Sequence, residues 1–148
     1  MDAYERVSGD LKAAMKGGDK ERVATLRMLL AAIQNERIAE GRAVDEEGLY
    51  GLVRRGVKQR REAVEAYRGG GREEAAAREE REIAILEEYL PAQVDEETLR
   101  AAVRELVDAE GLTGPQAIGQ VMKTLLPRFA GRADGATLSR IAREELAS

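Results

Sequence analysis

Apolar residues recur at intervals of three and four along most of the chain, which is the spacing that places them on one face of an α-helix. The alternation of apolar and polar residues that is typical of strands is absent. Glycine, proline and aspartate residues divide the pattern into seven segments. The sequence therefore predicts an all-α fold, with helices near residues 2–16, 19–40, 45–68, 73–90, 95–110, 115–126 and 134–147.

Several of the boundaries carry their own signals. Asp19, Asp45 and Asp95 stand where the side chain of an N-cap residue accepts a hydrogen bond from the first turn of a helix. Thr113 and Gln116 have the spacing of a capping box. Pro127 is expected to stop the sixth helix, because proline lacks the N–H group that a helix interior uses.

Pro91 separates two groups of helices. The residue before a proline avoids the α region, so the fourth helix is expected to end there. We predict a helical N-terminal domain, resembling a four-helix bundle, over residues 1–90. A linker over residues 91–94 would lead into a three-helix C-terminal domain over residues 95–148, which is small but large enough to fold.

The composition excludes several classes of function. The chain has no His and no Cys, so a Ser-His-Asp triad, a thiolate nucleophile and a zinc–thiolate site are impossible. We predict no catalytic residue, no metal site and no cofactor. The longest uncharged apolar run covers residues 28–33, far short of a membrane span, and the first residues lack a signal pattern. These features predict a soluble, cytoplasmic protein.

The loop over residues 127–135 combines positive charge with small residues. Residues 112–148 hold five basic and three acidic residues, although the whole chain carries a net charge of −4. An ordinary connection between helices explains the glycines through positive φ angles and Asp134 as a cap. A phosphate-binding loop explains the same features, because small residues let a backbone approach an anion. The candidate RNA-binding residues are Lys123, Arg128, Gly131, Arg132 and Gly135.

A second basic cluster lies on the third helix. Residues 51–61 contain five basic and no acidic residues, and Arg54, Lys58 and Arg61 fall on one stripe. This basic stripe pairs with an acidic neighbouring helix, lies in water, or faces RNA. Residues 62–88 could supply the acidic partners. We interpret the carboxylates of the fourth helix as a solvated face: Glu79, Glu80, Glu82, Glu87 and Glu88.

Three segments together resemble one known family. They are residues 22–36 (RVATLRMLLAAIQNE), residues 82–93 (EIAILEEYLPAQ) and residues 118–135 (IGQVMKTLLPRFAGRADG). In this order and spacing they resemble the YqeY-like family. That family is similar to the tail domain of the B subunit of tRNA-dependent Asp/Glu amidotransferases. The resemblance covers essentially the whole chain, and it implies a helical N-terminal bundle followed by a small three-helix domain.

The resemblance also implies a function. In the amidotransferase, the tail is non-catalytic and helps to hold the body of the tRNA, which places tRNA contact on the C-terminal domain here. Arg132 would contact phosphate, while Gly131 and Gly135 would permit close approach. Lys123 and Arg128 are added on electrostatic grounds. With few aromatic residues to stack on bases, recognition would use the shape and backbone of the RNA.

Three functional hypotheses remain open at this stage. The first is a non-catalytic tRNA-binding accessory protein, with amidotransferase subunits or a tRNA synthetase as protein partners. The second is a helical protein–protein adaptor whose N-terminal bundle displays a groove. The third, ranked lowest, is a component of a carbon–nitrogen ligase that uses glutamine as amido-N-donor. The chain lacks a Gly-rich nucleotide loop and an amidase nucleophile site that would support intrinsic ligase activity.

Overall fold

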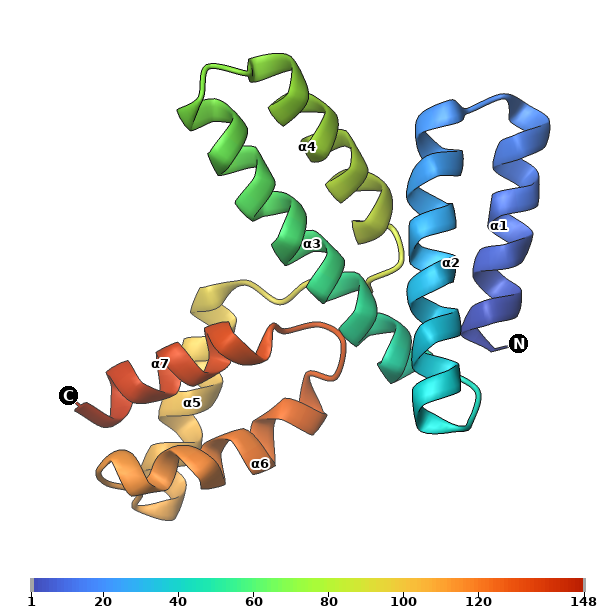
Figure 1. Cartoon of the computed structure of the whole chain (residues 1–148). Helices are drawn as coiled ribbons and strands as arrows, with labels where there is room; N and C mark the ends of the chain where they lie inside the picture. The colour runs from blue at the N-terminus through green and yellow to red at the C-terminus, as the bar shows by residue number, and fades with distance from the viewer. Residues whose placement is uncertain (1, 148) are drawn as a thin grey trace. The chain divides into compact units, whose positions relative to one another are not determined.

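The computed structural model describes residues 2–147, and helices account for most of them (Figure 1). Within this range there are seven α-helices, one short 3₁₀ helix and no strand, which confirms the predicted all-α fold. The elements are α1 (Ala3–Gly17), α2 (Lys20–Glu40), α3 (Glu46–Gly69), α4 (Glu73–Glu87), α5 (Glu96–Glu110), η1 (Pro115–Ala117), α6 (Ile118–Arg128) and α7 (Gly135–Ala147).

Three helix starts follow directly from local sequence. The carboxylate of Asp19 accepts a hydrogen bond from the backbone N–H of Arg22 at 3.1 Å. Asp45 and Asp95 accept in the same way from the third residue of their helices, each at 2.8 Å. Each cap satisfies a backbone donor that has no partner within the helix. The three predicted aspartate caps are therefore confirmed.

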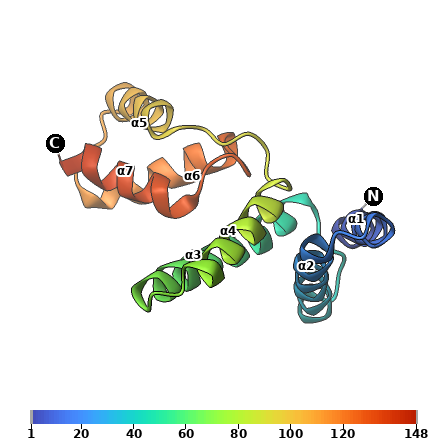
Figure 2. The same cartoon turned by 90° about the horizontal axis from the view of Figure 1, so that it is seen from above.

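Residues 1–90 form one compact unit, called unit 1 here, and residues 91–148 form a second, unit 2. In unit 1, α1 runs antiparallel beside α2, and α3 runs antiparallel beside α4 (Figures 1 and 2). Helix α2 packs against both α3 and α4, so it joins the two hairpins. The largest fully buried side chains of this core are Val7, Leu26, Ile33, Leu49, Val53 and Leu86.

Polar contacts reinforce the packing of unit 1. Arg81 of α4 binds Glu21 of α2 with 2.9 Å between Nη2 and Oε1. The hydroxyl of Tyr89, just after α4, donates to the carboxylate of Asp10 in α1 at 2.5 Å. These contacts connect both helices of the first hairpin to the end of the second.

Unit 2 has a separate core formed by α5, α6 and α7. Two residues of the connection between α6 and α7 also belong to it, because Phe129 and Ala133 are both buried. Their burial anchors that connection to the helices at two points. The largest fully buried side chains of this core are Leu99, Val103, Val121, Leu125, Leu138 and Ile141.

Two predicted helix ends differ from the structure. Helix α6 passes through Pro127 and ends at Arg128, and the N–H of Phe129 still donates to the carbonyl of Leu125 at 3.1 Å. Pro127 is the penultimate residue of α6, so the hydrogen bond that it cannot donate disrupts only the last turn of the helix. Helix α4 ends earlier than predicted, at Glu87, and residues 88–90 form a turn.

The predicted capping box before the sixth helix is wrong. A 3₁₀ turn precedes α6, its N-cap is Gly114 with φ of +78°, and no side chain caps it. The side chain of Gln116 folds back over Gly114, where a Cβ would lie 2.6 Å from Gln116 Oε1. Because the helical turn begins after Gly114, Thr113 and Gln116 do not hold the N-cap and N3 positions that a capping box requires.

Candidate nucleic-acid interface

The connection between α6 and α7, residues 129–134, is called the cation loop here. Its backbone is tied to the segment that leads into α5. The N–H of Val94 donates to the carbonyl of Arg132 at 2.8 Å, and the side-chain amide of Gln93 donates to the carbonyl of Gly131 at 3.0 Å. Within the loop, the N–H of Arg132 donates to the carbonyl of Phe129 at 2.8 Å. These bonds fix the backbone of the loop, so the backbone positions that carry its side chains are fixed as well.

The two glycines of the candidate site have different conformations. Gly131 has φ of +73°, as predicted, and this left-handed conformation favours glycine. Gly135 is the first residue of α7 and is not among the residues of positive φ, so the prediction for it is wrong. A Cβ at Gly135 would meet Leu126 Cδ1 at 3.9 Å, which is an ordinary contact. Gly135 is therefore not needed for the shape of the loop.

Three cations project to solvent at this end of unit 2. Lys123, Arg128 and Arg132 are all exposed, and none forms an ion pair with an acidic residue within residues 2–147. The guanidinium of Arg128 lies 5.4 Å from the centre of the Phe129 ring. Arg132 uses its Nε to donate to the carbonyl of Ala92 at 3.3 Å, which leaves its other N–H groups available.

These three cations do not share a single helix stripe. Lys123 and Arg128 are five residues apart on α6, which separates them by about 140° around the helix axis. Arg132 follows in the cation loop. The three cations are therefore spread from the middle of α6 to the cation loop, on different sides of the helix, and they do not form a continuous row.

Three other arginines of unit 2 are already paired with acidic side chains. Arg100 binds Glu144 at 2.7 Å, Arg104 binds Glu145 at 2.6 Å, and Arg140 binds both Glu96 and Glu144. These pairs lower the pKa of Glu144, because Arg100 and Arg140 hydrogen-bond to its carboxylate. The pairing of Arg140 leaves it little free positive charge to add near the loop.

The start of α7 is less open to an anion than its position suggests. Asp134 directly precedes the helix, and the carbonyl of Asp134 accepts the first helical hydrogen bond from Leu138 at 3.0 Å. Its carboxylate accepts from the hydroxyl of Thr137 at 3.3 Å. A carboxylate at this place already complements the helix dipole. The positive charge available to an anion at this site therefore comes from the three cations and not from the start of α7.

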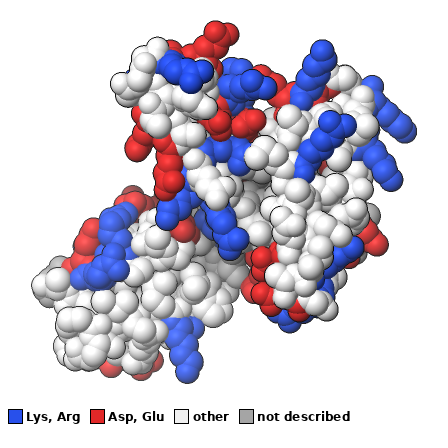
Figure 3. Space-filling model, viewed as in Figure 1, with Lys and Arg blue, Asp and Glu red and all other residues white. Residues whose placement is uncertain are grey.

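The basic stripe of α3 is divided among different environments. Arg61 forms an ion pair with Glu87 of α4 at 3.4 Å, Arg54 is half-buried, and Lys58 is exposed. On the face drawn in Figure 3, positive and negative side chains are interspersed within unit 1. The stripe thus offers less free positive charge than its sequence suggests.

Sequence reasoning missed a buried ion pair beside this stripe. Arg60 of α3 and Glu82 of α4 lie 3.3 Å apart, with 10% and 15% of their side chains exposed. Glu79 lies beside them, and its pKa is raised by burial and by the hydrogen bond and negative charge of Glu82. The interpretation of these carboxylates as a fully solvated face is therefore wrong for Glu79 and Glu82.

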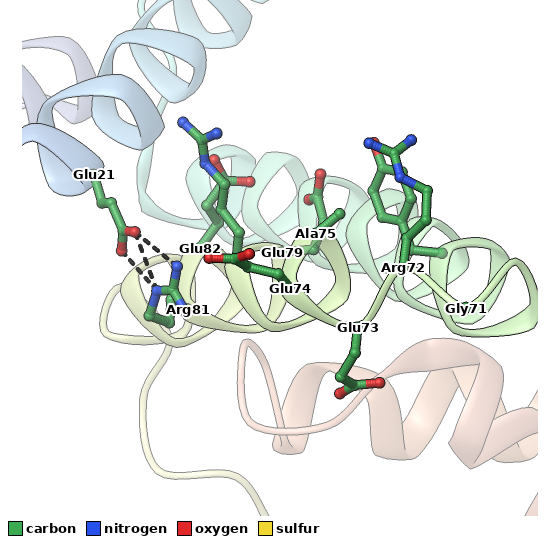
Figure 4. A pocket seen from close by; sticks show the side chains of 11 residues that line it. Glu21, Gly71, Arg72, Glu73, Glu74, Ala75, Glu79, Arg81 and Glu82 are labelled. Carbon is green, nitrogen blue, oxygen red and sulfur yellow. Dashed lines mark hydrogen bonds and ion pairs between the residues drawn. The ribbon is translucent and has the colours of Figure 1, made fainter.

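A hollow of about 740 Å³ lies between the start of α2 and α4 in unit 1 (Figure 4). Several of the charged side chains that line this hollow already contact other side chains. Arg81 binds Glu21 at its rim, and the guanidinium of Arg72 lies 5.1 Å from the centre of the Tyr67 ring. Within residues 2–147, no three acidic side chains gather as a metal ion would require.

None of the helices described is long and apolar enough to cross a membrane.

Fold and site together define a small helical protein with two compact units and a cationic loop. The model of the family described as "Yqey-like protein" matches residues 4–146. The chain belongs to the YqeY-like family.

Fungal relatives carry the name "Altered inheritance of mitochondria protein 41, mitochondrial". The protein from Lachancea thermotolerans is 36% identical over 91 residues, which cover 61% of this chain and 49% of the relative. That from Saccharomyces cerevisiae (strain YJM789) is 32% identical over 111 residues, covering 72% and 60%. The chain thus spans about half to three fifths of the length of these relatives.

Proposed function

We propose that this protein is a non-catalytic accessory protein that binds tRNA through the cation loop and the end of α6. The observation that carries the proposal is the contrast within unit 2. Lys123, Arg128 and Arg132 are exposed and lack acidic partners among the described residues, whereas Arg100 and Arg140 are paired. Unpaired cations on a fixed support suit the phosphates of a nucleic acid backbone.

The fixed loop supplies the geometry for this role. Hydrogen bonds from Val94 and Gln93 hold the backbone of the cation loop, so little chain entropy is lost when Arg132 meets a phosphate. Arg128 and Arg132 present planar guanidinium groups that can donate two parallel hydrogen bonds to one phosphate. Lys123 adds a point charge on another side of α6, where it can meet a neighbouring phosphate.

The resemblance to the amidotransferase tail supports tRNA as the nucleic acid. That tail holds the body of a tRNA and takes no part in the chemistry, which is the role proposed here. Amidotransferase subunits or a tRNA synthetase are the corresponding protein partners. We also propose that the protein is cytoplasmic. The alternative is a mitochondrial location, which the names of the fungal relatives indicate for those proteins.

Fluorescence anisotropy of labelled bulk tRNA with the purified full chain tests the proposal. The informative variant replaces the three cations together, Lys123→Gln/Arg128→Gln/Arg132→Gln. A matched control removes the same charge from unit 1, Lys12→Gln/Lys16→Gln/Lys20→Gln, at three exposed positions. We expect the first variant to weaken tRNA binding about tenfold or more at about 50 mM salt. Each cation that is removed loses one phosphate contact, so fewer counterions are released from the tRNA on binding.

The control separates a local site from bulk charge. Equal losses in both triple variants would mean that tRNA senses only net charge. No tRNA binding by the natural sequence at about 50 mM salt would remove the proposal altogether. Circular dichroism of each variant verifies that the helices remain.

A further inference from the structure

Unit 1 contains a groove between α2 and α3 with a largely apolar floor, called the α2–α3 groove here. It encloses about 170 Å³. For scale, an apolar cavity of about 150 Å³ can hold a benzene molecule. The groove is thus large enough for one bulky apolar side chain. Residues that line it include Met28, Ala32, Leu52, Arg55, Gly56 and Gln59.

One wall of the groove is an apolar side chain in contact with water. Met28 is 60% exposed, although Leu26 and Leu29 on the same helix face the core. Its Sδ accepts a hydrogen bond from Nη2 of Arg60 at 3.6 Å, which holds the thioether beside the groove. Methionine adapts its shape to different ligands because its side chain is flexible and polarisable. Within unit 1, helix α2 therefore presents a largely exposed apolar side chain beside the groove.

Gly56 is the residue of α3 that lines the groove without a side chain. It lies inside α3 without a positive φ, so the backbone conformation does not require glycine. Glycine within a helix usually costs about 1 kcal/mol relative to alanine. A Cβ at this position would stand 3.3 Å from both Arg60 Nη1 and Leu86 Cδ1. A larger residue here would therefore crowd Arg60 and Leu86, which also line the groove.

The rim of the groove is positively charged. Arg55 lines it, and Lys58 lies one helical turn further along α3. Both side chains are exposed, and neither forms an ion pair within residues 2–147. No acidic residue lines the groove, and the first acid on this side of α3 is Glu62, one turn beyond Lys58. An occupant with carboxylates beside an apolar anchor would match both features.

We propose that the α2–α3 groove binds an acidic amphipathic helix of a partner protein. One large apolar side chain inserts between Met28 and Gly56, and flanking carboxylates meet Arg55 and Lys58. This is the helix-in-groove mode of peptide recognition. A protein helix fits better than RNA, because a phosphate backbone has no apolar group to fill the floor.

Selection from a phage-displayed library of helical peptides tests the proposal on the full chain. The peptides have about 18 residues, or five turns, with the central anchor and its flanking positions randomised. We expect enriched peptides to carry Leu, Phe or Met at the anchor and Asp or Glu beside it. Failure to enrich any peptide, or enrichment of peptides without acidic flanks, overturns the proposal.

Methyl NMR locates the binding of an enriched peptide. The chain has four methionines, and labelling their methyl groups places probes on α1, α2 and α6. We expect the Met28 methyl signal to shift on titration, while those of Met15 and Met122 stay in place. Shifts at Met15 or Met122 without one at Met28 contradict the proposal, as does a Met28 shift that tRNA produces and the peptide does not.

Paired variants measure the contributions of charge and apolar contact. Arg55→Glu and Met28→Gln should each raise Kd about tenfold or more. Glutamine keeps an oxygen that can accept from Arg60, so the ion pair nearby is retained. Lys12→Glu and Met15→Gln on α1 are the matched controls and should leave Kd unchanged. Equal binding by the groove variants and the natural sequence, or self-association of the chain through this face, overturns the proposal.

Discussion

Arg60 of α3 and Glu82 of α4 form an ion pair between helices, and both side chains are at least 85% covered. A second bond fixes the arginine, whose Nη1 donates to the carbonyl of Gly56 at 3.1 Å. The pair lies where the α3–α4 hairpin packs on α2, because Arg60 also contacts the sulfur of Met28. It therefore connects three helices of unit 1.

Breaking this pair from one side should destabilise the protein. Glu82→Ala removes the carboxylate that pairs directly with the buried guanidinium of Arg60 and leaves only Glu79 nearby, so we expect the free energy of unfolding to fall by up to about 3 kcal/mol. Urea denaturation followed by circular dichroism measures the change. The exposed pair of Arg61 and Glu87 provides the control, since Glu87→Ala should have little effect. Equal losses of stability in both variants would contradict the argument that burial makes the Arg60–Glu82 pair more important than the exposed pair.

Glu79 makes the stability of unit 1 depend on pH. Burial and the neighbouring Glu82 raise its pKa above the ordinary value of 4.5. The folded state then holds this proton more tightly than the unfolded state, so stability falls as pH rises from 4.5 through the raised pKa. Glu79→Gln should therefore be more stable than the natural sequence at pH 7 by up to about 1 kcal/mol.

The gain of Glu79→Gln should disappear in acid, where Glu79 is protonated in both states. Denaturation curves collected between about pH 4 and pH 8 measure this convergence. Glu65→Gln, at an exposed position of α3, is the control for net charge. A gain that persists unchanged at low pH would assign the effect to something other than ionisation.

Tyr89 should control stability at alkaline pH. Its hydroxyl is buried and bonded to Asp10, and both effects raise its pKa above the ordinary value of 10.0. Stability from this bond is therefore present below pH 10 and declines as pH rises further. Tyr89→Phe should lower the free energy of unfolding by about 1 to 2 kcal/mol at pH 8, with a smaller difference near pH 11. A stability difference between the two proteins that stays constant from about pH 8 to about pH 11 would contradict a role for the ionisation of Tyr89.

Alanine substitutions at the two glycines near the cation loop should affect stability differently. Gly131→Ala places a Cβ on a residue with φ of +73°, and we expect a loss of about 1 kcal/mol in stability. Gly135→Ala adds a good helix former to the first turn of α7, so stability should rise or stay constant. Thermal unfolding of both variants measures the contrast. If Gly135→Ala also preserves tRNA affinity, close approach at Gly135 is not required.

Local sequence explains much of the fold. Asp19, Asp45 and Asp95 cap helices within three residues of their own position, so no distant contact decides the outcome. The exceptions are shifts of helix boundaries. The turn before α6 begins after Gly114, so Thr113 is not its N-cap, and α6 continues to Arg128 because Pro127 disrupts only its last turn.

Tertiary contacts explain what sequence could not reveal at the candidate site. Arg54, Lys58, Arg60 and Arg61 form one basic run in the sequence, but only packing against α4 assigns Arg60 to a buried pair. In unit 2, the sequence alone does not distinguish Arg140 from the cations of the loop. In the structure, Arg140 is bound by Glu96 and Glu144. Charge patterns predict which residues are cationic, whereas the fold determines which cations remain without partners.

The salt dependence of tRNA binding tests the central proposal most directly. Each phosphate contact contributes about 0.9 to the slope of log K against log salt concentration for a duplex. We expect replacement of Lys123, Arg128 and Arg132 by Gln to reduce this slope by about 2 to 3, and replacement of Lys12, Lys16 and Lys20 to leave it nearly unchanged. The same slope in all three proteins would contradict a tRNA site at the cation loop.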